Sequence, residues 1–196
     1  MQGPEIENSR RSGTREGHRR HIHNRMVILR AASDDAARLA EFAARTFAET
    51  FGAENTADDM VAHLAASYGV AQQRTEICNP DIITLLVEDD EQLAGYAQVR
   101  RNRAPIELPS ESAVELWRFY VDGPWHGRGV ATLMMSAAKD AAVALGGQQM
   151  WLSVWERNPR AIAFYGKCGF RIVGTKDFWV GSDRQTDHVM VAELRE

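Results

Sequence analysis

The stretch Val121-Asp122-Gly123-Pro124-Trp125-His126-Gly127-Arg128-Gly129-Val130-Ala131 is the part of the sequence that decides the fold. An apolar strand pattern ends where it begins, three glycines lie within the turn, and an apolar helix pattern starts at its end. Glycines allow a close approach to the backbone, and a helix N-terminus carries partial positive charge. Such a strand–loop–helix unit is suited to a pyrophosphate, and Arg128 could add a direct charge. The alternative is a glycine turn that joins strand to helix and binds nothing.

A second informative segment runs from Asn158 to Phe170. Asn158 is followed by proline, which is typical of the first turn of a helix. Tyr165 lies seven residues further on, two turns along the same helical face. The pair could offer an amide and a phenol to one ligand, or it could belong to a capped surface helix with a buried tyrosine.

Outward from these two segments, strand and helix patterns alternate along the chain. Its 196 residues suit one domain with a buried core, and we predict a single α/β domain of the α+β type over residues 26–196. Strands are predicted near residues 27–29, 82–87, 93–99, 114–121, 150–154, 170–173 and 189–194. Helices are predicted near residues 33–45, from 56 onward, and near 70–77, 129–145 and 158–167, with residues 46–52 as a separate segment closed by glycine.

Residues 1–25 form a basic tail that we predict to be disordered, since it is almost free of apolar residues. The tail carries a net charge of +3, so the remainder of the chain carries −7 out of a total of −4. One hypothesis is that Met26 is the natural start and that the tail is an extension upstream of it. The tail holds no aromatic residue to stack on bases, and the body is acidic, so we expect no nucleic-acid partner.

The composition also bears on location and metals. The N-terminus lacks the apolar region of a secretory signal, and no run approaches the roughly 18–20 apolar residues of a membrane span. The two cysteines, Cys78 and Cys168, make neither a metal-ligand spacing nor a disulfide framework. We therefore expect a cytoplasmic protein with reduced cysteines, no membrane partner and no metal.

Taken together, the two segments resemble the acyl-CoA-binding core of the GNAT superfamily of N-acetyltransferases. Residues 126–131 resemble its (Q/R)-x-x-G-x-(G/A) loop, with His126 where the family usually has Gln or Arg. Residues 158–170 resemble its N…A…(F/Y)Y…GF segment, and the resemblance spans roughly residues 27–194. It implies a mixed, mostly antiparallel sheet of about seven strands, flanked by helices and splayed between strands 4 and 5.

The resemblance also implies which residues bind acetyl-CoA as co-substrate. Backbone amides of residues 127–131 would hold the pyrophosphate, so that binding survives the change at His126. The strand that ends at Val121 would pair with the pantetheine arm, and an amide near Val121 would face the acetyl carbonyl. The implied cofactor-binding residues are Phe119, Val121, His126, Gly127, Arg128, Gly129, Val130, Ala131, Asn158, Ala161 and Tyr165.

For catalysis, the resemblance implies direct attack of an amine on the thioester, with Tyr165 protonating the departing thiolate. A tyrosine with an ordinary pKa of about 10 is a competent acid for a thiolate near 8–9. The resemblance implies Glu115 as the base, since a glutamate at the corresponding offset is the base in the histone-acetylating branch of the family. On an ideal strand residues 115, 117, 119 and 121 share a face, so Glu115 would face the acetyl site directly or through a water. Glu115 could equally be a solvent-facing strand residue. Asp122 is the competing carboxylate, but its position favours a turn former.

The acceptor is inferred from weaker signals. Residues 46–51, 79–82 and 181–190 are similar to the bacterial spermidine/spermine acetyltransferase-like branch, which implies a polyamine or a similar small cationic amine. Acidic residues near the implied acceptor site are Glu49, Glu54, Asp58 and Asp59, although the last two also suit the start of a helix. Aromatic residues for an apolar channel, or for the core, are Phe47, Phe51, Trp117 and Tyr120.

Two other functions remain open at this point. The chain could acetylate protein N-termini or lysines, or it could be a non-catalytic acyl-CoA-binding regulatory module. The presence of Glu115, Asn158 and Tyr165 together favours catalysis. The family also implies a possible homodimer, for which the edge of the last strand is a plausible contact.

Overall fold

The computed structural model describes residues 26–108, 112–180 and 183–194, apart from the side chains of Glu54, Val180 and Asp183. The strands are β1 (Met26–Arg30), β2 (Ile82–Asp89), β3 (Gln92–Arg101), β4 (Ala113–Val121), β5 (Gln149–Trp155), β6 (Arg171–Val180) and β7 (Asp183–Glu193). The α-helices are α1 (Ala36–Phe51), α2 (Ala57–Ser67), α3 (Val70–Cys78), α4 (Val130–Ala144) and α5 (Pro159–Lys167). Short 3₁₀ turns lie at Ser33–Asp35, Gly52–Glu54 and Gly123–Trp125.

The strands form one seven-stranded sheet in the order β1-β2-β3-β4-β5-β7-β6. Every neighbouring pair is antiparallel except β4 and β5, which confirms the predicted mixed, mostly antiparallel sheet. The expectation of a free edge on the last strand is wrong, because β7 lies between β5 and β6. The edges of the sheet are β1 and β6.

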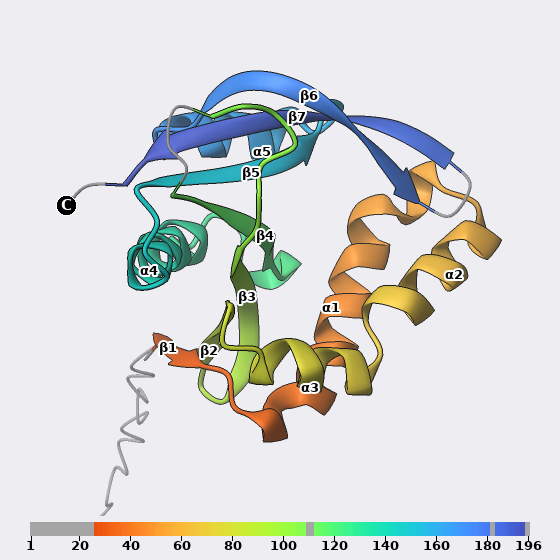
Figure 1. The fold of residues 1–196 in the computed structure, drawn as a ribbon. Coiled ribbons are helices and arrows are strands. Elements are labelled where there is room, and N and C mark those ends of the chain that lie inside the picture. Colours follow the sequence, from red (N-terminus) through yellow and green to blue (C-terminus); the bar gives the residue numbers. More distant parts are fainter. Residues whose placement is uncertain (1–25, 109–111, 181–182, 195–196) are drawn as a thin grey trace, which may run out of the picture.

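The sheet divides between β4 and β5, which confirms the predicted splay (Figure 1). Parallel pairing joins only residues 113–115 of β4 to residues 149–151 of β5. Beyond these pairs β4 continues to Val121 and β5 to Trp155 without pairing to each other. The divergence leaves backbone groups of β4 without a strand partner on the β5 side, which opens the sheet at its centre.

Helices cover both faces of the sheet. On one face α4 and α5 pack into a core of aliphatic and Met side chains that includes Met134, Leu152 and Tyr165. On the other face α1 and α2 cover an aromatic core that includes Phe47 and Tyr96. Figure 1 shows α1 and α2 beneath the far end of the β6–β7 hairpin, and α4 on the opposite side of β4.

Predicted and observed elements differ mainly in length. Helix α1 does not end near Arg45 but continues to Phe51, because Phe47 on the same apolar face is buried in the core. The last two strands are longer than predicted, because they pair with each other as a hairpin beyond the sheet core. The turn between β2 and β3 places Asp90 and Glu91 at positive φ.

No helix in the described part of the chain has both the length and the apolar character needed to cross a membrane.

Candidate active site

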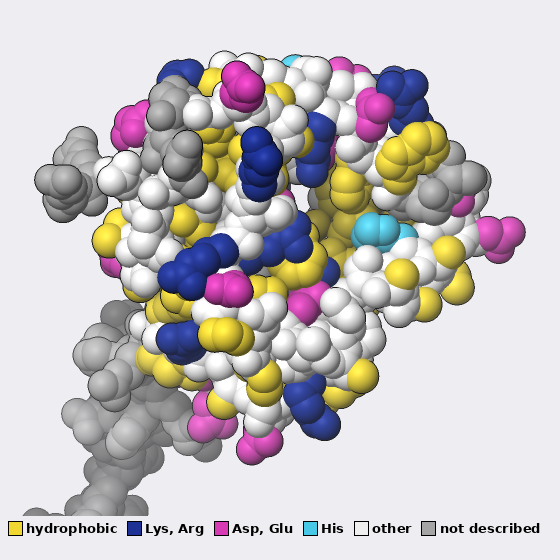
Figure 2. Space-filling model, viewed as in Figure 1, with side chains coloured by type: hydrophobic (Ala, Val, Ile, Leu, Met, Phe, Trp, Pro, Cys, Tyr) yellow, Lys and Arg dark blue, Asp and Glu magenta, His cyan; other side chains and the backbone are white. Residues whose placement is uncertain are grey.

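A cleft of about 960 Å³ opens where β4 and β5 part. Its walls come from β4, the turn before α4, β5 and α5 on one side, and from α1 and the β6–β7 hairpin on the other. Figure 2 shows the hollow in this face of the molecule, with hydrophobic side chains exposed along its wall. Most of the residues predicted from sequence lie on this lining, including Phe119, Val121, Asn158 and Tyr165.

The glycine turn presents backbone donors to the cleft. Gly127 and Gly129 have φ of +76° and +83°, a left-handed conformation in which side chains are strained. In the described part of the chain, the N–H groups of Gly127, Gly129, Val130 and Ala131 donate to no backbone carbonyl. The N–H of Arg128 differs, since it donates to the carbonyl of Trp125 at 3.4 Å. The turn therefore offers an anion-binding N-terminus of α4.

Asp122 holds this turn in place, which supports its interpretation as a turn former. Its carboxylate accepts the N–H of Gly123 at 2.8 Å and two hydrogen bonds from the guanidinium of Arg45 on α1, at 2.9 and 2.7 Å. The hydrogen bonds from Arg45 lower the pKa of Asp122 below its ordinary value. The indole of Trp125 adds a bond to Asp89 at 3.0 Å. The turn is thus tied to α1 and to the β2–β3 hairpin.

The edge of β4 supplies a second set of donors. The N–H of Asp122 bonds to Ala94 of β3 at 2.9 Å, so strand alternation directs the N–H groups of Val121 and Phe119 to the other side, toward the opening. The ring of His126 turns back to the carbonyl oxygen of Val121 at 2.7 Å. The imidazole of His126 therefore contacts the backbone at the end of β4, and it does not point toward the N–H groups of residues 127–131.

A β-bulge in β4 changes which side chains share a face. Ala97 of β3 pairs with Phe119, but Val99 pairs with Leu116, so Trp117 is the extra residue. Paired residues lie on one face, and Ala97 and Val99 are two apart, so Leu116 and Phe119 lie on the same face. Alternation is therefore broken at Trp117.

The bulge corrects the expectation for Glu115. This residue lies on the face opposite Phe119 and Val121, so the predicted shared face is wrong. Its carboxylate is buried, with 4% of the side chain exposed, and accepts from Arg100 at 2.5 Å and from Asn102 at 2.7 Å. Glu115 is not among the described residues that line the cleft.

Helix α5 brings Asn158 and Tyr165 to the cleft together, as their spacing predicts. The side-chain oxygen of Asn158 caps the helix by accepting the N–H of Ala161 at 3.0 Å, so this oxygen is engaged within the chain and the NH₂ group is the donor end of the side chain. Tyr165 is buried among Phe119, Phe164 and Phe170. Burial raises the pKa of the Tyr165 phenol well above its ordinary value, which corrects the assumption of an unperturbed acid.

The α1 side of the cleft is aromatic. Phe47, Phe51, Trp117 and Tyr120 all line it, and Phe47 also belongs to the buried core. Of the acidic residues expected here, Glu49 lines the cleft. Asp58 and Asp59 lie in the first turn of α2, where Asp59 pairs with Thr56, as the helix-start alternative predicts. The side chain of Glu54 lies outside the described residues.

Sequence reasoning missed Asp187, a carboxylate of β7 that also lines the cleft. Only 5% of this residue is exposed. Asp187 lies between the polar stretch of residues 183–186 and the more apolar residues that follow His188, which gives a weak signal, since its side chain could face either side of the sheet. Its burial depends on how β7 packs between β5 and β6.

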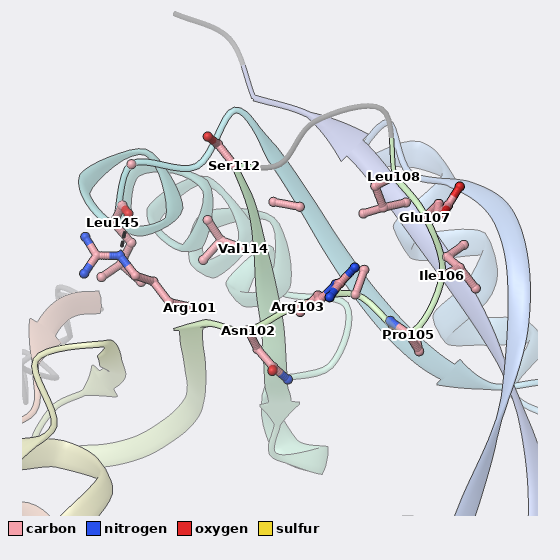
Figure 3. Close-up of a pocket in the computed structure, with 13 residues that line it drawn as sticks. Arg101, Asn102, Arg103, Pro105, Ile106, Glu107, Leu108, Ser112, Val114 and Leu145 are labelled. Atoms are coloured by element: carbon pink, nitrogen blue, oxygen red, sulfur yellow. Dashed lines mark hydrogen bonds between the residues drawn. The ribbon is translucent and has the colours of Figure 1, made fainter.

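A second hollow, of about 1110 Å³, lies behind β4 at the segment that follows β3 (Figure 3). Arg101 donates from Nε to the carbonyl of Leu145 at 3.0 Å, and the carbonyl of Asn102 accepts the indole N–H of Trp151 at 3.1 Å. These bonds hold the segment against α4 and β5. None of the described residues lining this hollow was predicted for the site, whereas most of the predicted residues line the cleft between β4 and β5.

Known proteins resemble this chain in both sequence and fold. A family model described as "Acetyltransferase (GNAT) family" matches residues 36–170. An uncharacterised N-acetyltransferase of Mycobacterium tuberculosis is 32% identical over 160 residues, covering 82% of this chain and 98% of that protein. Another from Lactobacillus delbrueckii is 27% identical over 167 residues, covering 85% and 96%. The PaiA N-acetyltransferase of Thermoplasma acidophilum, solved in complex with coenzyme A, has a TM-score of 0.70 at 19% identity, over 86% of this chain and 99% of that one.

Proposed function

The chain belongs to the acetyltransferase (GNAT) family, and we propose that it transfers the acetyl group of acetyl-CoA to a primary amine by direct attack. The observation that carries the proposal is the meeting, in one cleft, of a helix N-terminus with free amides, an open strand edge and a buried tyrosine. Each part matches one part of the co-substrate: the pyrophosphate, the pantetheine arm and the sulfur.

The residues present fit acetyl-CoA by their donor chemistry. The amides of Gly127, Gly129, Val130 and Ala131 hold the pyrophosphate, since an anion at a helix N-terminus is favoured by both hydrogen bonds and the dipole. The open edge of β4 pairs with the amide-containing pantetheine arm, and the NH₂ of Asn158 adds a donor from α5. The N–H of Val121 stabilises the negative charge that develops on the acetyl oxygen.

Tyr165 stabilises the departing sulfur. Because burial raises its pKa, the phenol keeps its proton at physiological pH and acts as a hydrogen-bond donor. Full proton transfer to a thiolate, whose thiol has a pKa of about 8.5, would be unfavourable from such a phenol. The proton that the sulfur takes therefore comes from the attacking nitrogen, while the O–H of Tyr165 supports the charge as the C–S bond breaks.

The acceptor is a small primary amine that carries an apolar part. Of the four acidic residues expected to receive a polycation, Glu49 alone lines the cleft among the side chains that the structure describes. The rest of this wall is aromatic, and it suits a short cationic amine better than a long polyamine. Spermidine and a peptide N-terminus remain useful members of a test panel.

The test is thiol release from acetyl-CoA with phenethylamine, spermidine, spermine, lysine, an N-terminal peptide and an aminoglycoside. We expect turnover with at least one amine and greater kcat/KM for phenethylamine than for spermine. Calorimetry of acetyl-CoA binding is the companion measurement. An absence of acetyl-CoA binding would refute the proposed function, whereas binding without turnover would leave a non-catalytic acyl-CoA module.

A further inference from the structure

Asp187 is a buried carboxylate with an unused hydrogen-bonding position. It lines the cleft from β7, and 5% of the residue is exposed. Its Oδ1 has no hydrogen-bond partner among the residues that the structure describes. Burying an oxygen of an ionised carboxylate away from water, with no hydrogen-bond donor facing it, is energetically unfavourable. Such a group is expected where a cationic ligand completes its bonding.

The strand register directs Asp187 toward the aromatic wall. Asp187 pairs with Trp155 of β5 and with Lys176 of β6, so these three side chains share a face. Ser153 and Phe178, two residues from those partners, share the same face, and both line the cleft. The carboxylate therefore lies beside Trp155 and Phe178 on the cleft side of the hairpin.

The aromatic wall continues from these rings onto α1. The centroid of Trp155 is 6.0 Å from that of Phe51, which is 4.7 Å from that of Phe47. The ring of Phe47 is 6.5 Å from Tyr120 of β4. Aromatic faces attract ammonium groups, and the attraction grows when water is excluded. A carboxylate beside aromatic rings is a combination that suits an alkylammonium with an apolar neighbour.

Groups on β5, β6 and β7, and just beyond the end of β5, affect the pKa of Asp187. Burial raises the pKa of Asp187, and Glu156 beyond the end of β5 raises it further. A hydrogen bond from Ser153 and the charges of Lys176 and His188 lower it. Burial prevails, so the carboxylate is a better proton acceptor than an ordinary aspartate. Glu49 and Arg118 line the same cleft from α1 and β4.

We propose that Asp187 binds the ammonium group of the acceptor and takes the proton that must leave before the nitrogen can attack. The inference rests on the proposed function, which it deepens by naming the acceptor-binding residue. The ammonium gives one proton to the carboxylate, which later releases it to solvent. The neutral nitrogen forms the C–N bond, the C–S bond breaks, and the remaining extra N–H proton goes to the sulfur.

The test compares Asp187→Asn with Asp177→Asn, a matched control on the same hairpin whose carboxylate is exposed and pairs with Arg184. With phenethylamine as acceptor, we expect Asp187→Asn to lower kcat/KM about 10²- to 10⁴-fold, the range for loss of a general base. Its affinity for acetyl-CoA should be unchanged, and Asp177→Asn should behave as wild type. The acid limb of the pH–kcat/KM profile should disappear in Asp187→Asn.

Stability gives a readout that a structural role would not reproduce. An acid whose folded pKa is raised loses its contribution to stability as pH rises from its unfolded pKa to its folded pKa, and above the folded pKa the ionised form destabilises the fold by a constant amount. Asp187→Asn should therefore keep or raise Tm at pH 8 while activity falls. A Tm below wild type together with an intact acid limb would overturn the proposal. Glu115→Gln is the rival test, and loss of the acid limb in that variant alone would also overturn it.

A second measurement needs no turnover. Carbon NMR of ¹³C-labelled aspartate, with the Asp187 signal identified from Asp187→Asn, follows the carboxyl pKa with and without phenethylamine. Bound ammonium should lower the pKa of Asp187, because an opposite charge favours the ionised form. No shift with any amine of the panel would refute the role of Asp187 even if the enzyme is active. Failure to bind acetyl-CoA would instead refute the proposed function. The change in the pKa of Asp187 on addition of amine would then still test whether Asp187 binds an ammonium group.

Discussion

Replacing Gly129 by alanine separates the binding role of the turn from its role in folding. Gly129 precedes α4 at the cleft, and Gly146 follows it at the other end, with φ of +83° and +84°. A Cβ added at either position would meet nothing within 4 Å, so both substitutions carry the same left-handed strain and no clash. Gly129 lines the cleft, whereas Gly146 lines the second hollow. Gly146→Ala is thus a matched control.

The expected loss of Tm follows from backbone strain, and the expected loss of acetyl-CoA affinity follows from a lost hydrogen bond to the turn. A non-glycine residue in the left-handed region costs about 1–2 kcal/mol, and each kcal/mol shifts Tm by about 2–4 °C in a domain of this size. Both variants should therefore melt about 2–8 °C lower. At Gly129 the methyl group also stands where the pyrophosphate approaches. Loss of one charge-assisted hydrogen bond, about 1.5–3 kcal/mol, weakens acetyl-CoA binding roughly 10- to 150-fold.

Thermal melting and isothermal calorimetry with acetyl-CoA measure the two effects separately. We expect equal losses of Tm in the two variants and a raised Kd for Gly129→Ala alone. Equal Kd values in both variants would refute the reasoning that the pyrophosphate binds at this helix N-terminus. A raised Kd in Gly146→Ala would show that the effect spreads through α4 and is not local to the amides.

Three further predictions test other parts of the site. Tyr165→Phe should lower kcat about 10²- to 10³-fold, the range for loss of one donor to a developing charge, with acetyl-CoA affinity unchanged by calorimetry. Because the pKa of Asp122 is lowered in the folded state, its bond with Arg45 stabilises the fold above the unfolded pKa of about 3.9 and is lost as pH falls below it. Asp122→Asn should therefore lower Tm at pH 7, and the gap to wild type should narrow progressively as pH falls from about 4 through the lowered pKa of the folded state; a constant gap would contradict this. Glu76→Gln, which breaks the buried ion pair with Arg118 of the cleft wall (2.5 Å), should reduce the urea-derived unfolding free energy by about 3–5 kcal/mol. A loss below about 1 kcal/mol would show that the pair is solvated.

Local patterns predicted the elements near the chemistry because those elements have local causes. The glycine turn needs positive φ at Gly127 and Gly129, and a helix must begin after it. Asn158 caps α5 with its own side chain, and Tyr165 follows by helical geometry. These features depend on neighbours within about two helical turns, which the sequence contains.

Features that depend on distant partners were not predicted. The bulge at Trp117 arises in the pairing of β4 with β3, and it places Glu115 on the opposite face from the one that simple alternation indicates. β7 lies inside the sheet because it pairs with β5 on one side and with β6 on the other, so the free edge falls on β6. The length of α1 depends on the burial of Phe47 against residues of other elements.

By itself the sequence determined the family, the glycine turn at the start of α4, and the pairing of Asn158 with Tyr165 on one helix, because these rest on short-range spacing. Only the tertiary structure decided which carboxylate faces the cleft. Glu115 and Asp187 are both strand residues, but their surroundings differ. Glu115 forms an ion pair with Arg100 on the neighbouring strand β3. Asp187 lies beside Trp155, and its Oδ1 has no hydrogen-bond partner among the described residues. The direction and partner of a strand side chain depend on register with other strands, and register is a property of the assembled sheet.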